Sequence, residues 1–150
     1  MKPKLPPLVV VLAFAGLMFL LDRFLPVGEF EFFGRGALAF FLLVLGLVVL
    51  VIALVQFGRA KTPTDPMNLE KTTVLVRGGL YKYSRNPMYL GMLMLLLSLG
   101  LFLGNAFNTL LAALFVMYMN RFQIQREEER LSRTYGKEYA KFLKETRRWF

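Results

Sequence analysis

A short polar stretch precedes the third apolar run of the sequence, and its residue types could hold an anion. The stretch reads YSRNPMYLG and covers residues 83–91. Asn86 is a favoured residue at a helix N-cap, and Pro87 suits the first helical position. A helix that begins here presents free N–H groups and a partial positive charge, to which Arg85 adds a fixed cation. The stretch therefore indicates a carboxylate or phosphate site, or else only a helix cap with an arginine that reaches lipid phosphate.

Residues on either side of this stretch could shape the same site. Gly78 and Gly79 would let the backbone approach a ligand closely. Tyr89 lies about one turn into the predicted helix, and its side chain would point back towards the helix N-terminus. In the alternative interpretation, the tyrosines around this stretch belong to an interfacial aromatic belt.

A pair of carboxylates offers the second kind of chemistry. Glu127 and Glu128 lie in the charged cluster REEER, which follows the fourth apolar run without a helix breaker. Carboxylates near a membrane surface are costly unless they are paired or used. These two could accept hydrogen bonds from ribose hydroxyls or from an ammonium group. The alternative is a solvated helix face, the usual meaning of a charge run.

The last residues form a basic and aromatic segment, YGKEYAKFLKETRRWF. Such a composition is typical of an anchor at the membrane surface. A second interpretation is that the segment folds back over the pocket, so that Arg147, Arg148 and Trp149 contact the polar head of a substrate. Both interpretations place this segment at the cytosolic face.

Composition excludes several other chemistries. The 150-residue chain is 56% hydrophobic, carries a formal net charge of +9, and has neither Cys nor His. It therefore lacks disulfides, thiolate or imidazole metal ligands, a Cys nucleophile and a His general base, and no metal is predicted. Because the basic charge accompanies so much apolar surface, we expect anionic lipid head groups as partners, and no nucleic acid.

The elements that must position these residues are apolar helices. We expect an all-α, polytopic transmembrane bundle in a single domain, residues 1–150, whose last two helices form a hairpin that turns at Gly104-Asn105. A span needs roughly 20 residues. The predicted spans are residues 5–22, 36–57, 87–104 and 106–123, with a cofactor loop at 58–86 and an amphipathic cytosolic tail at 124–150.

Charge distribution sets the expected orientation. Basic residues outnumber acidic ones in residues 59–85 and in the tail, and Lys2 and Lys4 precede the first run. Four spans with both termini in the cytoplasm put all these basic segments on one side, as the positive-inside rule requires. The first run also fits a signal peptide, although no small-residue cleavage site follows it.

Two segments of the chain resemble a known family. GLYKYSRNPMYLG resembles the G-P-Y-x-x-x-R-[HN]-P-x-Y-x-G box of the isoprenylcysteine carboxyl methyltransferases and phospholipid methyltransferases, which include small bacterial members. EEERLSRTYGKEYAKFLKETRRW resembles the C-terminal box of the same family. The likeness covers residues 62–149. It implies an integral membrane enzyme of the bacterial cytoplasmic membrane that transfers a methyl group from S-adenosylmethionine, leaving S-adenosylhomocysteine, to a membrane lipid or lipophilic small molecule.

The resemblance also implies roles for individual residues. The cofactor-binding candidates are Gly79, Tyr81, Arg85, Asn86, Tyr89, Glu127 and Glu128. The substrate-binding candidates are Tyr139, Arg147, Arg148 and Trp149. The catalytic candidates are Arg147, Arg148 and Glu128.

This chain departs from the family pattern at two positions. Asn86 stands where the eukaryotic enzymes have His, and an amide cannot titrate; Leu80 stands where the box has Pro. Two alternatives remain at this level: a non-catalytic membrane protein that keeps the fold, and a relative of the nicotinamide-dependent sterol reductases. The acceptor atom, whether oxygen, nitrogen or sulfur, is not specified by the sequence.

Overall fold

The computed structural model describes residues 5–25, 27–60 and 75–150, and within these ranges the chain is helical, with one isolated β-bridge between Glu29 and Asn105. The expected all-α class is confirmed. The elements are α1 (Pro7–Phe24), α2 (Arg35–Ala60), the 3₁₀ turn η2 (Gly79–Lys82), α3 (Pro87–Leu103), α4 (Phe107–Tyr118), the π turn η3 (Met119–Ile124), α5 (Gln125–Tyr135) and α6 (Lys137–Glu145). Residues 61–74, about half of the loop predicted at 58–86, lie outside the described residues.

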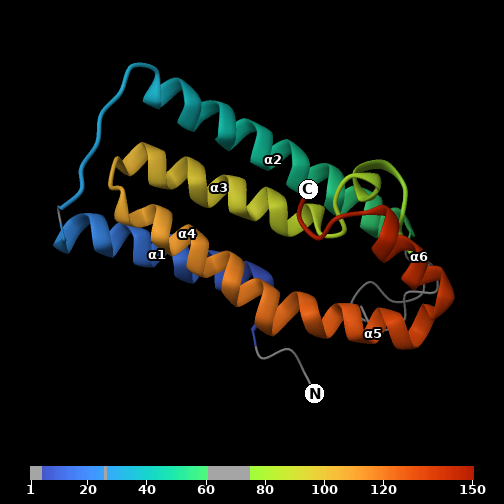
Figure 1. The fold of residues 1–150 in the computed structure, drawn as a ribbon. Helices are drawn as coiled ribbons and strands as arrows, with labels where there is room; N and C mark the ends of the chain where they lie inside the picture. The colour runs from blue at the N-terminus through green and yellow to red at the C-terminus, as the bar shows by residue number, and fades with distance from the viewer. Residues whose placement is uncertain (1–4, 26, 61–74) are drawn as a thin grey trace.

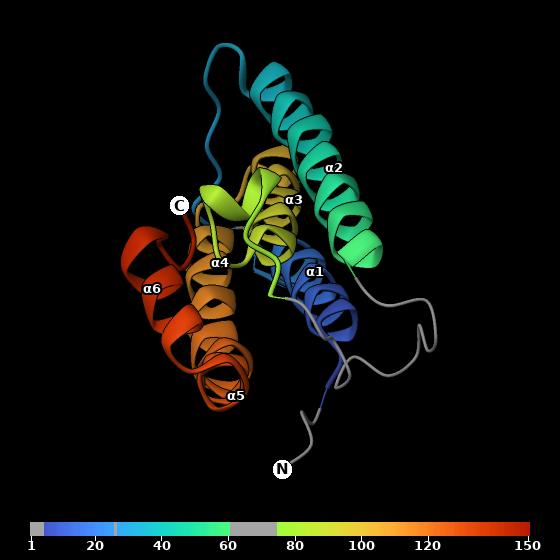
Figure 2. The same ribbon diagram turned by 90° about the vertical axis from the view of Figure 1, so that its right-hand side faces the viewer.

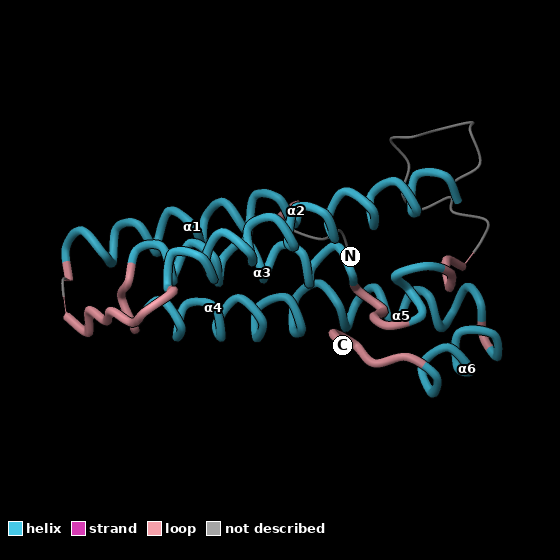
Figure 3. The backbone as a smooth tube through the Cα atoms, turned by 90° about the horizontal axis from the view of Figure 1, so that it is seen from above, coloured by secondary structure: helices cyan, strands magenta, loops and turns pink. Residues whose placement is uncertain are grey.

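Four helices run side by side and alternate in direction, and α5 and α6 project from one end (Figures 1 and 3). Two of the four, α1 and α2, are long and apolar enough to cross a membrane. α3 is apolar but has 17 residues, and α4 has 12 before the π turn begins. Many large apolar side chains of α1 and α2 are exposed, as lipid-facing side chains would be.

Glycines bring α2 and α3 into backbone contact. A Cβ added to Gly91 would lie 3.0 Å from the carbonyl oxygen of Gly46 and 3.0 Å from the backbone nitrogen of Leu50. Ser98 on α3 also donates a 2.6 Å hydrogen bond to the carbonyl of Ala39 on α2. Small residues allow this closeness, which maximises van der Waals contact between apolar helices. Figure 2 shows that α2 packs on α3 on the side of the bundle away from α5 and α6.

The main core lies between α1, α3 and α4. Met18, Phe115 and Met119 are fully buried there, and Leu96 is nearly so. The rings of Phe14 and Phe115 meet edge to face with centroids 5.6 Å apart, a favourable geometry for aromatic pairs. This core fixes α3 against α4, whose helix continues into α5, and so holds Tyr89 of α3 near the glutamates of α5.

The left end of the bundle in Figure 1 is closed by backbone hydrogen bonds, and we call it the hairpin end (residues 27–35 and 104–107). Gly104 ends α3 in the left-handed conformation (φ 71°), so the predicted hairpin turn is confirmed. The N–H of Phe30 donates to the Gly104 carbonyl at 2.8 Å, and the N–H of Ala106 donates to the Gly28 carbonyl at 2.9 Å. The buried amide of Asn105 donates to the Leu25 carbonyl and accepts from the Phe107 N–H.

At the opposite end, α4 passes into α5 through the π turn Met119–Ile124 without a break. α5 then leads through Gly136 into α6, which folds back beside it (Figure 1). A π turn places one more residue in a helical turn than an α-turn does. It therefore sets how α5 is rotated relative to α4.

Candidate functional site

The polar stretch before α3 does begin a helix, with Asn86 at the N-cap and Pro87 as the first helical residue. The prediction that the Asn86 side chain caps this helix is wrong, however. The Asn86 amide makes no capping bond; its Nδ2 donates to the carbonyl of Arg148 at 3.0 Å. The Ser84 hydroxyl instead accepts from the Asn86 N–H at 3.2 Å. Asn86 therefore joins α3 to the C-terminal segment.

Glu128 lies between two arginines. Arg148 donates to both of its carboxylate oxygens, from Nε at 3.0 Å and from Nη2 at 2.7 Å. Arg85 donates from Nη2 to the same carboxylate at 3.2 Å. The exposed fractions of these side chains are 12% for Arg85, 17% for Glu128 and 33% for Arg148. Two-point pairing between a guanidinium and a carboxylate is strong and fixes direction, and the bonds to Glu128 raise the pKa of Arg148.

The C-terminal segment folds back over this cluster, and we call residues 146–149 the C-terminal strap. Its backbone carbonyls accept from α3-side groups: Arg147 O accepts from the Arg85 N–H at 2.9 Å, and Thr146 O accepts from the Arg85 guanidinium. The Trp149 indole donates to Asn120 Oδ1 at 3.0 Å. Arg147 contributes its carbonyl here, while its side chain is exposed.

Glu127 faces the interior rather than the strap. Its Oε1 accepts from the Tyr89 hydroxyl at 2.6 Å and from Gln123 Nε2 at 2.8 Å. Burial raises the pKa of the Glu127 carboxyl, and the hydrogen bonds from Tyr89 and Gln123 oppose that rise. The two adjacent glutamates thus have different surroundings, since Glu128 has two cationic partners and Glu127 has neutral donors. A difference of this kind suits two separate tasks.

A second aromatic cluster borders the site. Tyr81 of η2 packs with Tyr139 and Phe142 of α6, and all three are buried. Burial raises the pKa of Tyr139 to about 12 and also raises that of Tyr81. Both phenols stay protonated at neutral pH, so each can donate a hydrogen bond but neither serves as a phenolate base.

Gly79 has a local role that the family pattern does not describe. It adopts a left-handed conformation (φ 59°), and a Cβ there would collide with the side-chain amide of Gln56 on α2. The same amide accepts from the N–H of Leu80 at 3.2 Å. Gln56 therefore attaches η2, and Tyr81 within it, to the end of α2.

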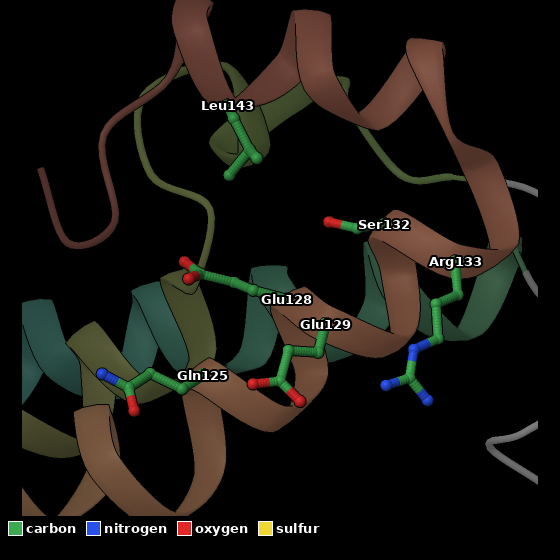
Figure 4. Close-up of a pocket in the computed structure, with 6 residues that line it drawn as sticks. All are labelled: Gln125, Glu128, Glu129, Ser132, Arg133 and Leu143. Carbon is green, nitrogen blue, oxygen red and sulfur yellow. The ribbon is translucent and has the colours of Figure 1, made fainter.

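An open hollow of about 460 Å³ lies between α5 and α6, lined by Gln125, Glu128, Glu129, Ser132, Arg133 and Leu143. Figure 4 shows Leu143 pointing into it from α6, opposite Ser132 and the Glu128 carboxylate on α5. Of the cofactor-binding candidates, this hollow includes Glu128 alone. Polar groups of Arg85, Asn86, Tyr89 and Glu127 instead bond to other protein groups.

One polar atom of the cluster lacks a partner. Arg85 Nε is buried without a hydrogen-bond acceptor among the described residues, although the rest of its guanidinium is well bonded. A buried N–H without an acceptor is costly. It offers a donor for a carboxylate or another anionic oxygen.

Three side chains that hold the site together are not predicted from the sequence. Asn120 binds Trp149, Gln123 binds Glu127, and Gln56 binds the backbone of η2. All three are amides at the ends of apolar helices. Their polarity where an apolar run ends was the signal for Asn120 and Gln56, and it does not name a partner. Gln123 also lies four residues before Glu127, the spacing of a helical side-chain pair.

Comparison with known proteins now adds to this geometry. The family model described as phospholipid methyltransferase matches residues 35–138. The chain belongs to the phospholipid methyltransferase family. The matched range includes α2, α3, α4, the π turn and α5, and so carries Arg85, Glu127 and Glu128, whereas most of α6 and Arg148 follow it.

Two relatives are consistent with this membership. The chain is 31% identical to the protein-S-isoprenylcysteine O-methyltransferase of Schizosaccharomyces pombe over 115 residues, which are 77% of this chain and 48% of that protein. It is 42% identical over 62 residues to an uncharacterized protein of Haemophilus influenzae, covering 41% of this chain and 98% of that protein. The chain thus spans about half the length of the yeast enzyme. Family membership and the two long apolar helices together indicate a membrane methyltransferase.

Proposed function

We propose that this protein transfers a methyl group from S-adenosylmethionine to a lipophilic acceptor at the cytosolic face of the membrane. The observation that carries the proposal is the convergence of Arg85, Glu128 and Arg148 from the loop before α3, from α5 and from the C-terminal strap. These elements lie far apart in the sequence. Family membership supplies the reaction class for this cluster.

The residues present suit the cofactor chemically. S-adenosylmethionine supplies a methyl group on a sulfonium, with a carboxylate, an ammonium group and ribose hydroxyls for recognition. Arg85 would hold the carboxylate, since its buried Nε still lacks an acceptor among the described residues. Glu127 and Glu128 would accept from hydroxyl or ammonium donors. Asn86, Tyr89, Gly79 and Tyr81 complete the proposed cofactor site.

The acceptor would be held at the strap. Arg147 and Arg148 can orient an anionic head group, and Tyr139 and Trp149 can pack against an apolar part of it. Displacement at a methyl carbon needs alignment and exclusion of water more than acid or base chemistry. An anionic acceptor, such as a carboxylate or thiolate, would need no base. An amine acceptor could lose its proton to Glu127, whose pKa is raised by burial.

The proposed topology follows from the alternating helix directions. Four spans, with α4 completed by the π turn, would leave α5, α6 and the strap together on the cytosolic side, with both termini cytoplasmic. That arrangement places the basic residues of the tail beside anionic lipid head groups. A lipid or lipophilic substrate would then reach the cluster at the membrane surface.

Calorimetric titration tests the proposal. S-adenosylmethionine and S-adenosylhomocysteine are titrated into detergent-purified protein, for the wild type, Glu128→Gln and the control Glu138→Gln. Glu138 is an exposed carboxylate of α6 paired with Arg77, so its substitution removes the same charge outside the cluster. We expect Glu128→Gln to weaken binding about tenfold, or about 1.4 kcal/mol, and Glu138→Gln to have no effect. A folded wild type that binds neither ligand would favour a non-catalytic membrane protein.

A further inference from the structure

The π turn Met119–Ile124 carries two amides that reach the site from within one helical turn. Asn120 Oδ1 accepts the indole N–H of Trp149 at 3.0 Å, and Gln123 Nε2 donates to Glu127 Oε1 at 2.8 Å. Neither amide belongs to the boxes that link this chain to its family. The two bonds reach the two halves of the site, the strap and the interior carboxylate.

The bond from Asn120 fixes the strap at its last aromatic residue. Trp149 also packs against the main core cluster, so its indole has both an apolar contact and a polar partner. Arg148 directly precedes it in the chain. Because only one peptide bond separates them, anchoring the indole restricts where the Arg148 guanidinium and carbonyl can lie. Those groups are the ones that meet Glu128 and Asn86.

The bond from Gln123 acts on the other glutamate. Glu127 accepts from Gln123 and from Tyr89 through the same oxygen, Oε1, which fixes the carboxylate against α3. Its second oxygen, Oε2, is then the one turned away from these two donors. Without Gln123, the Glu127 side chain would be free to rotate about Tyr89.

The π geometry of this turn sets where Glu127 and Glu128 lie relative to α4. Deleting its extra residue would rotate α5 by about 100° relative to α4, one residue step of an α-helix. Glu127 and Glu128 would then leave Tyr89 and Arg85. Single π turns within α-helices occur frequently at functional sites.

We propose that Asn120 and Gln123 are positioning residues of the methyltransferase site: Asn120 holds the strap through Trp149, and Gln123 holds Glu127. This inference rests on the proposed function, which makes Glu127, Glu128 and the strap parts of a methyltransferase site. The anchoring of the strap can nevertheless be measured without any cofactor, since Trp149 is the single tryptophan of the chain.

The first measurement is Trp149 fluorescence and its quenching by acrylamide in detergent, without cofactor. We expect Asn120→Leu to shift the emission to longer wavelength and to increase quenching. Asn120→Asp keeps an acceptor oxygen and should restore the wild-type signal. Arg121→Gln, an exposed position of the same π turn, is the control and should leave the signal unchanged. Circular dichroism and thermal melting establish that each variant is folded.

The second measurement is the affinity for S-adenosylhomocysteine by calorimetry. We expect Asn120→Leu and Gln123→Leu each to weaken binding roughly fivefold, the scale of one lost hydrogen bond. Gln123→Leu should do so without changing Trp149 quenching, because its bond lies on the Glu127 side. A change in Trp149 quenching for Asn120→Leu but not for Gln123→Leu would show that each amide positions its own partner. A general loosening of the fold would instead change both quenching and affinity in both variants.

Two results would overturn the inference. One is unchanged Trp149 quenching in a folded Asn120→Leu variant; the other is a quenching change with full affinity for S-adenosylhomocysteine. A failure of the proposed function has a different signature, since the wild type would then bind no S-adenosylhomocysteine while Asn120→Leu still released Trp149.

Discussion

The two ends of the helical bundle are closed by different kinds of bond. At the hairpin end, backbone groups pair with backbone groups and with the neutral amide of Asn105, and the charged pair there joins Arg35 to the exposed Glu31 within the same short segment. At the other end, which we call the strap end, charged side chains meet one another: Glu128 has two guanidinium partners, and Glu127 is buried against two neutral donors. Both ends join segments that are distant in the sequence.

The two ends differ in whether a bound ligand could replace the bonds that close them. The bonds at the hairpin end join backbone groups to one another, and we assign that end a role in holding the fold together. The guanidinium and carboxylate groups at the strap end are the groups that would bind a zwitterionic ligand, and at present they bind each other. Side chains that form ion pairs with one another stay ordered, and a charged ligand could replace one member of a pair. Such an arrangement costs free energy because several charges are buried.

The largest effect is expected from Glu128→Ala. It leaves Arg85 and Arg148 facing each other without their carboxylate, and we expect a loss of about 2–4 kcal/mol in the free energy of unfolding, below the range for fully buried pairs. Equilibrium unfolding in mixed micelles measures it. Arg148→Ala added to this variant should cost little more, because the two residues share one interaction. Full additivity of the two changes would contradict the ion-pair network.

Asn105→Leu tests the hairpin end. It removes the donor to the Leu25 carbonyl and the acceptor for the Phe107 N–H, and we expect a loss of about 2 kcal/mol. The same unfolding measurement applies. Unlike the change at Glu128, this one should leave both Trp149 quenching and the affinity for S-adenosylhomocysteine at their wild-type values. A change in either would mean that the two ends are coupled.

Glu127→Gln separates the two glutamates by pH. The pKa of the Glu127 carboxyl is raised in the folded state, so folding is most favourable below the unfolded value of about 4.3 and weakens as pH rises through the folded pKa. The variant cannot titrate and lacks this weakening. We expect its melting temperature, relative to wild type, to rise between pH 4 and pH 8. A constant difference across that range would show that burial does not perturb this carboxyl.

Salt should give the smallest effect. At about 1 M salt the Debye length is about 3 Å, which weakens the partly exposed pair of Arg148 and Glu128 more than any neutral bond. We expect a small increase in Trp149 quenching between low and high salt in the wild type, and a smaller one in Glu128→Gln. Equal increases in both proteins would assign the change to the apolar contact of the indole instead.

The sequence predicted those features that depend on local composition. The apolar helices, the start of α3 at Pro87 and the turn at Gly104 follow from hydropathy and from proline and glycine, whose backbone preferences act locally. The return of the tail to Arg85 and Asn86 is one of the two interpretations of the sequence, and the backbone hydrogen bonds of the strap favour it. The roles proposed for the site residues stay predictions.

Other features depend on tertiary contacts that no local pattern encodes. Nothing in MNRFQI distinguishes a π turn from an α-turn, since the choice depends on what α5 must reach. Asn86 is the N-cap by position, yet its amide serves the strap because the Arg148 carbonyl lies within reach. Asn120 was unrecognised for the same reason, since its partner comes from the strap. Gln123 differs, because it lies four residues before Glu127 and helical spacing alone allows that pair.

The glycine contact between α2 and α3 restricts how material in the bilayer can move past the protein. At the depth of Gly46 and Gly91 a methyl group added to either glycine would lie only about 3 Å from atoms of the facing helix, closer than an ordinary van der Waals contact. An acyl or isoprenoid chain is wider than a methyl group, so the seam between these two helices is shut to it. In the proposed function, such a chain would therefore reach the Arg85 cluster by passing around α2 and α3 together. A bulky substitution at either glycine would push these two helices apart and so disturb the fold.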